Sequence, residues 1–221
     1  SGSYNTALGP NALTANTSGI SSVAVGHSAL LVNTTGQQSV AVGNSSLENN
    51  TSGSYNTALG RSALSANTTA SYNTAVGYQS LTSNTTGTRN VGVGYNTLSL
   101  NTTANDNTSV GHDALDVNTT GAFNTALGSS ALGSNTTAAA NTAVGYQALT
   151  TNTTGGDSAA FGYQAAQSNT TGDYLTAIGR QALYNNTTAD YNTAVGYRAS
   201  YANTTGFRNV ALGAFTGQNV T

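Results

Sequence analysis

The stretch that decides the fold is "NTAVGYQALTTNTTG" at residues 141–155, because nearly the same words recur elsewhere in the chain. "NTAVGYQSLTSNTTG" stands at residues 73–87 and "NTAVGYRASYANTTG" at residues 192–206. The glycine of this phrase recurs every 17 residues, so the 221 residues divide into thirteen repeats of 17 with no insertion or deletion. A fixed short period indicates a repeat architecture, in which each repeat is one structural unit.

We number the columns of the repeat from 1 to 17, with residues 137–153 as the reference. Column 9 is Gly and column 17 is Thr in all thirteen repeats. Column 7 is Ala in eleven repeats, column 8 is always Val, Leu, Ile or Phe, and column 13 is Leu in ten. The small and β-branched residues favour strands, whereas Gly and Asn tolerate the positive φ angles of corners.

A repeat of 17 residues is too short for a helix–turn–helix repeat or a propeller blade. Two short strands and two turns fit this length. The sequence therefore predicts an all-β fold without helix: a β-solenoid (β-roll) of thirteen 17-residue coils, forming a single domain over residues 1–221. Parallel coils of this kind would stack about 4.8 Å apart.

Alternation along the strand assigns side chains to two faces. Columns 6 and 8 (Thr142 and Val144) are predicted to fill the coil interior, together with the Leu of column 13. On this assignment Val144→Asp would disrupt the stacking, since a buried unpaired carboxylate costs several kcal/mol. Columns 5 and 7 (Asn141 and Ala143) would lie on the other face. The Ala row there indicates either a two-layered coil with a thin interior or a surface that packs against a partner chain.

The repeat resembles known fibrous proteins. "SVAVG" at residues 22–26 and 39–43 is similar to the short "S-V-A-I-G" strand in the head repeats of trimeric autotransporter adhesins. With its "N-T-T-G" corner, the phrase also resembles repeats of phage tail fibres and large bacterial surface proteins. The period of 17 differs from the shorter coil of the adhesin heads. The resemblance implies a left-handed, trimeric β-roll on a cell or virion surface, used as a stalk or for attachment.

Composition and charge argue against several functions. Charged residues make up 5% of the chain and the net charge is −2, so there is no basic footprint for nucleic acid. There is no apolar run long enough for membrane insertion and no Cys for a thiolate metal site. The two histidines, His27 and His112, stand five repeats apart in column 10, too distant to share a metal. We therefore expect no enzyme activity, no cofactor and no metal site.

A few polar and aromatic residues are predicted to stack between neighbouring coils. Asp173 and Asp190, both in column 3, are either a carboxylate pair that suits a weak cation or two solvated acids. Arg89 and Asp106 in column 4 predict a surface ion pair of small worth. Tyrosine pairs either hold sugar rings or cover the surface and stabilise strand pairing: Tyr55–Tyr72, Tyr78–Tyr95, Tyr146–Tyr163, Tyr174–Tyr191 and Tyr184–Tyr201.

The pattern "N-T-[ST]" is the strongest functional signal. It predicts either N-glycosylation sites or a ladder of stacked Asn amides at a turn, on one line along the coils. The invariant Thr of column 17 favours a structural constraint, because a glycosylation acceptor pattern does not specify its middle residue. The asparagines concerned, including the shifted last one, are Asn16, Asn33, Asn50, Asn67, Asn84, Asn101, Asn118, Asn135, Asn152, Asn169, Asn186, Asn203 and Asn219.

These patterns favour a structural or adhesive extracellular fibre, either a filament segment, a stalk or a surface appendage. The alternatives are a glycan- or receptor-binding module of the tail-fibre kind and, third, an ice-binding solenoid. The expected partners are further copies of the chain, as a head-to-tail filament or a homotrimer, with carbohydrate as a second kind of partner. The last repeat drifts, with Gly217 in column 13 and Val220 in column 16, but keeps the phase that end-to-end stacking requires. The expected location is the cell or virion surface.

Overall fold

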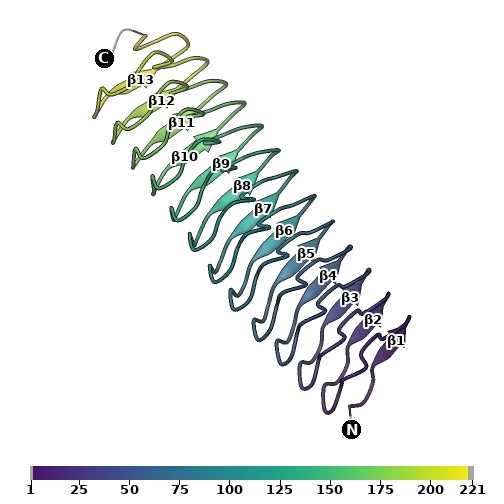
Figure 1. Cartoon of the computed structure of the whole chain (residues 1–221). Coiled ribbons are helices and arrows are strands. Elements are labelled where there is room, and N and C mark those ends of the chain that lie inside the picture. Colours follow the sequence, from purple (N-terminus) through teal and green to yellow (C-terminus); the bar gives the residue numbers. More distant parts are fainter. Residues whose placement is uncertain (1, 219–221) are drawn as a thin grey trace. The chain divides into compact units, whose positions relative to one another are not determined.

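The computed structural model describes residues 2–218 and shows a β-solenoid (Figure 1). Every repeat forms one three-residue strand from columns 6–8, and the described residues contain no helix. Two compact parts are distinguished, Ser1–Asn107 and Thr108–Thr221. The first part contains β1 (Thr6–Leu8), β2 (Val23–Val25), β3 (Val40–Val42), β4 (Thr57–Leu59), β5 (Thr74–Val76) and β6 (Val91–Val93). The second contains β7 (Thr108–Val110), β8 (Thr125–Leu127), β9 (Thr142–Val144), β10 (Ala159–Phe161), β11 (Thr176–Ile178), β12 (Thr193–Val195) and β13 (Val210–Leu212).

Within each part, every strand pairs in parallel with the next strand along the chain. The partners are always 17 residues apart, as in the pairing of Ala143 in β9 with Ala160 in β10. Each column of the sequence therefore stacks on itself from coil to coil. This confirms the predicted all-β solenoid with a 17-residue coil.

The prediction of two strands per coil is wrong. Columns 4, 11 and 13 lie in the left-handed region in every described repeat, with φ between 48° and 64°. Examples are Ala140 (φ 59°), Gln147 (φ 56°) and Leu149 (φ 51°). A left-handed residue turns the chain and interrupts a strand, so columns 10–15 form successive turns in place of a second strand.

The predicted assignment of the two strand faces is also wrong. Ala143 of column 7 has no exposed surface, while Thr142 and Val144 on either side of it are partly exposed. The Ala row therefore faces the interior and is not a surface for a partner. The interior role predicted for column 13 is confirmed, since Leu149 is fully buried. Because Val144 lies on the outer face, the expected effect of Val144→Asp loses its basis.

The interior is thin, which explains why column 7 is Ala. A Cβ atom added at Gly92, the one Gly in this column, would lie 2.5 Å from Ser80 Oγ and 3.0 Å from Thr97 Oγ1. Ser80 and Thr97 belong to column 12, which is Ala in most repeats. Gly92, the smallest residue of column 7, thus faces Ser80 and Thr97, which are larger than the usual Ala of column 12. The space between the strand and the opposite wall holds methyl-sized groups, and a Val or Leu of column 8 does not fit there.

Candidate functional surfaces

A ladder of asparagine amides runs along column 16. Asn84 Nδ2 donates to Asn67 Oδ1 at 3.1 Å and to the Gly87 carbonyl at 2.9 Å. Asn84 Oδ1 accepts a hydrogen bond from Asn101 Nδ2 at 2.8 Å. Asn67, Asn84 and Asn101 are fully buried. Within each part of the chain, the column forms one line, as predicted.

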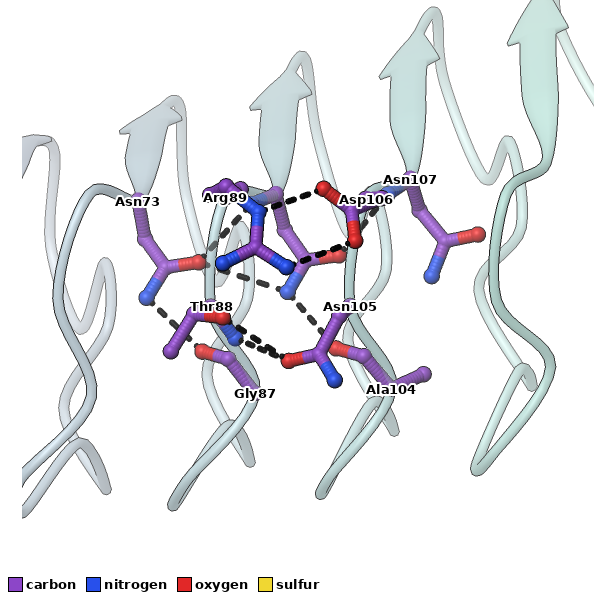
Figure 2. A network of polar contacts seen from close by, with 9 residues as sticks. Asn73, Gly87, Thr88, Arg89, Ala104, Asn105, Asp106 and Asn107 are labelled. Atoms are coloured by element: carbon purple, nitrogen blue, oxygen red, sulfur yellow. Dashed lines mark hydrogen bonds and ion pairs between the residues drawn. The ribbon is translucent and has the colours of Figure 1, made fainter.

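Column 5 forms a second line of buried amides, which the sequence reasoning placed on the wrong face. Asn73 Nδ2 donates to the Gly87 carbonyl at 2.8 Å, and Asn73 Oδ1 accepts from the Asn90 backbone N–H at 2.9 Å (Figure 2). The same Gly87 carbonyl also accepts from Asn84. Column 5 is Asn in nine repeats and Ser in three. This nearly constant polar residue was the sequence signal that could have indicated a second line of hydrogen-bonded side chains. The two columns together satisfy polar backbone groups at the corner between them.

The burial of column 16 bears on the two interpretations of the "N-T-[ST]" pattern. From Asn33 to Asn203 these side chains are at most 1% exposed. Their Nδ2 atoms, to which a glycan would be attached, donate hydrogen bonds within the coil stack, as Asn118 does to the Gly121 carbonyl at 3.0 Å. This geometry suits the ladder. Glycosylation stays a prediction that mass spectrometry of the peptides decides, and Asn219 lies outside the described residues.

The invariant threonines of column 17 use their hydroxyl groups in the coil stack. Thr51 Oγ1 donates to the Thr68 carbonyl at 3.0 Å, and Thr153 Oγ1 donates to the Thr170 carbonyl at 3.0 Å. Each such bond joins one coil to the next. The constancy of this column therefore has a structural cause.

The ion pair predicted between Arg89 and Asp106 is present. Arg89 Nε lies 2.6 Å from Asp106 Oδ1 and Nη2 lies 2.9 Å from Oδ2, a two-pronged contact shown in Figure 2. The hydrogen bond from Arg89 holds the pKa of Asp106 below its usual range, and Asp106 raises the pKa of Arg89. Both groups are solvent-exposed, so water screens the attraction and the pair adds little stability.

The other predicted acidic and histidine residues hold neighbouring groups of the chain. Asp190 Oδ1 accepts the Asp173 backbone N–H at 2.9 Å, and Asp173 Oδ1 accepts the Gly156 N–H at 2.6 Å. His27 Nδ1 contacts Ser28 Oγ at 3.1 Å. Over residues 2–218 no group of three or more His, Cys, Asp or Glu side chains is arranged to hold a metal ion.

Asp116 is an acid whose pKa is raised. Burial raises the pKa of the Asp116 carboxyl, and the negative charge of Asp113 raises it further. The neighbouring His112 Nδ1 lies 3.0 Å from Asp113 Oδ2. Asp116 thus costs stability when it is charged.

All five predicted tyrosine pairs are stacked. Their ring centroids are 4.8–5.4 Å apart and the ring planes are within 18° of parallel. In each pair one face of each ring is covered by its partner. The rings therefore stabilise the stacking of neighbouring coils, and sugar binding by these pairs stays a prediction.

The outer face of the strands carries an apolar strip. It consists of the column 8 side chains, which alternate along the strand with the buried Ala of column 7. Thr or Val of column 6 lies beside the strip in most repeats and is partly exposed. The most exposed members of the strip are Leu8, Val42, Leu59, Val110, Leu127, Phe161, Ile178 and Leu212.

Comparison with models of known protein families, with curated proteins and with solved structures found no match. No pocket is present in the described part of the chain. None of the described residues forms a helix of the length and apolar character needed to cross a membrane.

Proposed function

We propose that the chain is a non-catalytic structural segment of an extracellular or virion-surface rod, which associates with further copies of itself. The observation that carries this proposal is the exposed apolar strip of column 8. Soluble monomers rarely leave a contiguous apolar patch open to water, and such patches mark sites of association. A second copy is the natural occupant, because a repetitive strip presents the same spacing of side chains on both chains.

The hydrogen bonding supports a mechanical role. The strand ladder, the two Asn columns and the Thr column all join one coil to the next. Bonds of all these kinds run between neighbouring coils, so bending a part of the solenoid would strain them together. Repeat proteins of this kind obtain their stability from contacts between nearest neighbours.

The end strands suit end-to-end stacking. Within the described residues, β1 pairs only with β2, and its three residues are exposed. An open strand edge is a template for another strand in the same register. Further coils, either of the same chain or of a second copy, would cover this edge and extend the rod through a head-to-tail contact.

The experiment is a measurement of assembly by light scattering and electron microscopy. We expect the parent chain to form filaments or lateral bundles, and the triple variant Leu59→Lys, Leu127→Lys, Phe161→Lys to lose lateral association while keeping its β-sheet circular dichroism. Gln37→Lys, on an exposed residue outside the strip, is the matched control and should assemble like the parent. A parent that stays monomeric at high concentration contradicts the proposal, as does a triple variant that associates unchanged.

Ice binding is a second candidate, because eight repeats place Thr in column 6 on the outer strand face. Regularly spaced hydroxyl and methyl groups on a flat sheet are the feature that would order water. The hydroxyls of column 17, by contrast, are engaged in coil-to-coil hydrogen bonds. An ice-recrystallisation assay on the parent and on Thr142→Lys tests this candidate; normal crystal growth in the presence of the parent eliminates it.

A further inference from the structure

A row of aromatic and cationic side chains lies in column 10 of the second part of the chain. The Tyr146 and Tyr163 rings stack with centroids 5.4 Å apart. The Arg180 guanidinium carbon lies 5.3 Å from the Tyr163 ring centre and 5.9 Å from the Tyr197 ring centre. Arg180 thus sits between two rings and remains exposed. We call Tyr146, Tyr163, Arg180 and Tyr197 the Tyr–Arg row.

Column 11 places a second row directly beside it, formed by Gln147, Gln164, Gln181 and Arg198. Arg198 Nε donates to Gln181 Oε1 at 2.8 Å, and Gln181 Nε2 donates to Gln164 Oε1 at 2.9 Å. Gln164 Nε2 in turn donates to Gln147 Oε1 at 3.0 Å. Every hydrogen bond of this amide row points the same way.

This polarity leaves donors as the unused groups. Each glutamine oxygen of the amide row already accepts a hydrogen bond. Gln181 is buried, whereas Gln147 and Gln164 are partly exposed and each has a second amide N–H. The Nη groups of Arg198 add further donors, and its guanidinium carbon lies 4.8 Å from the Tyr201 ring centre. Stacking on Tyr201 and the bond to Gln181 hold this guanidinium in place before any ligand arrives.

The two arginines are not neutralised. Across residues 2–218, no carboxylate lies within ion-pair distance of Arg180 or Arg198. The acids of the same coils, Asp157, Asp173 and Asp190, stand in columns 3 and 4, on the other side of the strand in sequence. The surface therefore combines uncompensated positive charge with an excess of hydrogen-bond donors, which is complementary to an anion.

We propose that the Tyr–Arg row and the amide row bind a polysaccharide that carries carboxylate groups. Guanidinium forks match carboxylates in a two-pronged geometry, and the donors of the amide row recur from coil to coil as acids recur along a polymer. Tyr146 and Tyr163 cover one face of each other's ring, which leaves fewer open ring faces on which a neutral sugar could stack. The second part of the chain has three Arg and five Asp, 3 − 5 = −2, so its net charge does not attract a polyanion and the attraction depends on the local charges of Arg180 and Arg198.

The test measures binding of the full chain to immobilised polygalacturonate and to the same polymer after complete methyl esterification. We expect binding to the acidic polymer, loss of binding on esterification, and weakening as salt is raised. Arg180→Gln and Arg198→Gln should each weaken binding about tenfold, the effect of one lost charged hydrogen bond. Arg61→Gln is the matched control, because Arg61 also stands in column 10 over a tyrosine, Tyr78, but column 11 of its own coil holds Ser62 where the coil of Arg180 holds Gln181.

Each result decides the proposal. It is overturned if neither polymer binds, if both bind equally, or if Arg61→Gln weakens binding as much as Arg180→Gln. Stronger binding to polyglutamate than to polygalacturonate would overturn it in favour of an acidic peptide. Unchanged melting temperatures of the three variants would show that a loss of binding is not a loss of folding. The result is independent of self-association, which the Lys variants of the apolar strip test separately.

Discussion

At the residue scale, the coil depends on left-handed backbone at columns 4, 11 and 13. This conformation costs an ordinary L-residue roughly 1–2 kcal/mol and is worst for β-branched side chains. Although Thr and Val are frequent elsewhere in the repeat, none of the residues in these three columns is Val, Ile or Thr. The absence of β-branched residues from these columns is a sequence signal for the three turns. It also explains why the buried column 13 holds Leu, which is apolar but not branched at Cβ.

We expect Leu149→Ile to destabilise the protein by about 2 kcal/mol, since it forces a β-branched side chain to φ 51°. Leu149→Met is the control, because it keeps an unbranched Cβ and a similar volume and should cost less than about 1.5 kcal/mol. Chemical denaturation of the two variants measures the difference. Equal stability of the Ile and Met variants would refute the backbone explanation.

We expect Gly145→Ala to be more damaging still. Its Cβ would lie 2.5 Å from the Gly162 carbonyl oxygen, at a backbone φ of 131°. The nearest atoms all belong to the backbone and not to a flexible side chain, so the stacking of two coils must change. Gly133→Ala, whose Cβ comes no closer than 3.3 Å to any atom, should retain near-parent thermal stability. A Gly145→Ala protein that melts with the Gly133→Ala control would contradict this account.

At the scale of the structural element, the repeated unit is a strand of three residues and a line of amides. The strand is too short to be stable alone, so its neighbours above and below must supply the missing contacts. The Asn lines extend the hydrogen-bonded ladder to the corner, where the backbone is otherwise unpaired. The interior of the coil is therefore both apolar, along columns 7, 12 and 13, and polar, along columns 5 and 16.

Asn49 and Asn50 offer a matched test of the amide line. Asn50 is fully buried, donates to Asn33 Oδ1 at 2.8 Å and accepts from Asn67 Nδ2 at 2.7 Å. Asn50→Ala should cost about 1–3 kcal/mol, because it leaves buried polar partners unsatisfied. Exposed Asn49 makes one bond to the Ser65 carbonyl, so Asn49→Ala should cost less than about 0.5 kcal/mol. Similar denaturation midpoints for the two variants would show that the ladder is not stabilising.

At the scale of the whole molecule, few charges contribute to stability. The exposed pair Arg89–Asp106 is weak, and the perturbed acid Asp116 is destabilising when ionised. The chain is instead joined by hydrogen bonds and thin apolar contacts between coils. We therefore expect its stability to respond weakly to salt and to depend on pH at a few identifiable residues.

Asp116 is one residue at which the stability of the fold should depend on pH. Its pKa is raised in the folded state, so the folded chain binds a proton more tightly than the unfolded chain. Stability should fall as pH rises from the usual carboxyl pKa, about 3.9, through the raised folded value, and then level off. Asp116→Asn should remove this fall and be more stable than the parent at pH 7. Asp106→Asn, at an acid whose pKa is lowered, should not raise stability at pH 7.

The sequence by itself determined the period, the parallel stacking of each column and the alignment of the column 16 asparagines, whereas their burial was shown only by the tertiary structure. These follow from a strict 17-residue repeat, because identical columns can only stack in one register. The strand alternation showed that columns 6 and 8 share one face and columns 5 and 7 the other. Which face lies inside was decided only by the tertiary structure. Three left-handed turns bring column 12 close behind column 7, and the space between them holds Ala but not Val or Leu, so the larger apolar side chains remain on the surface.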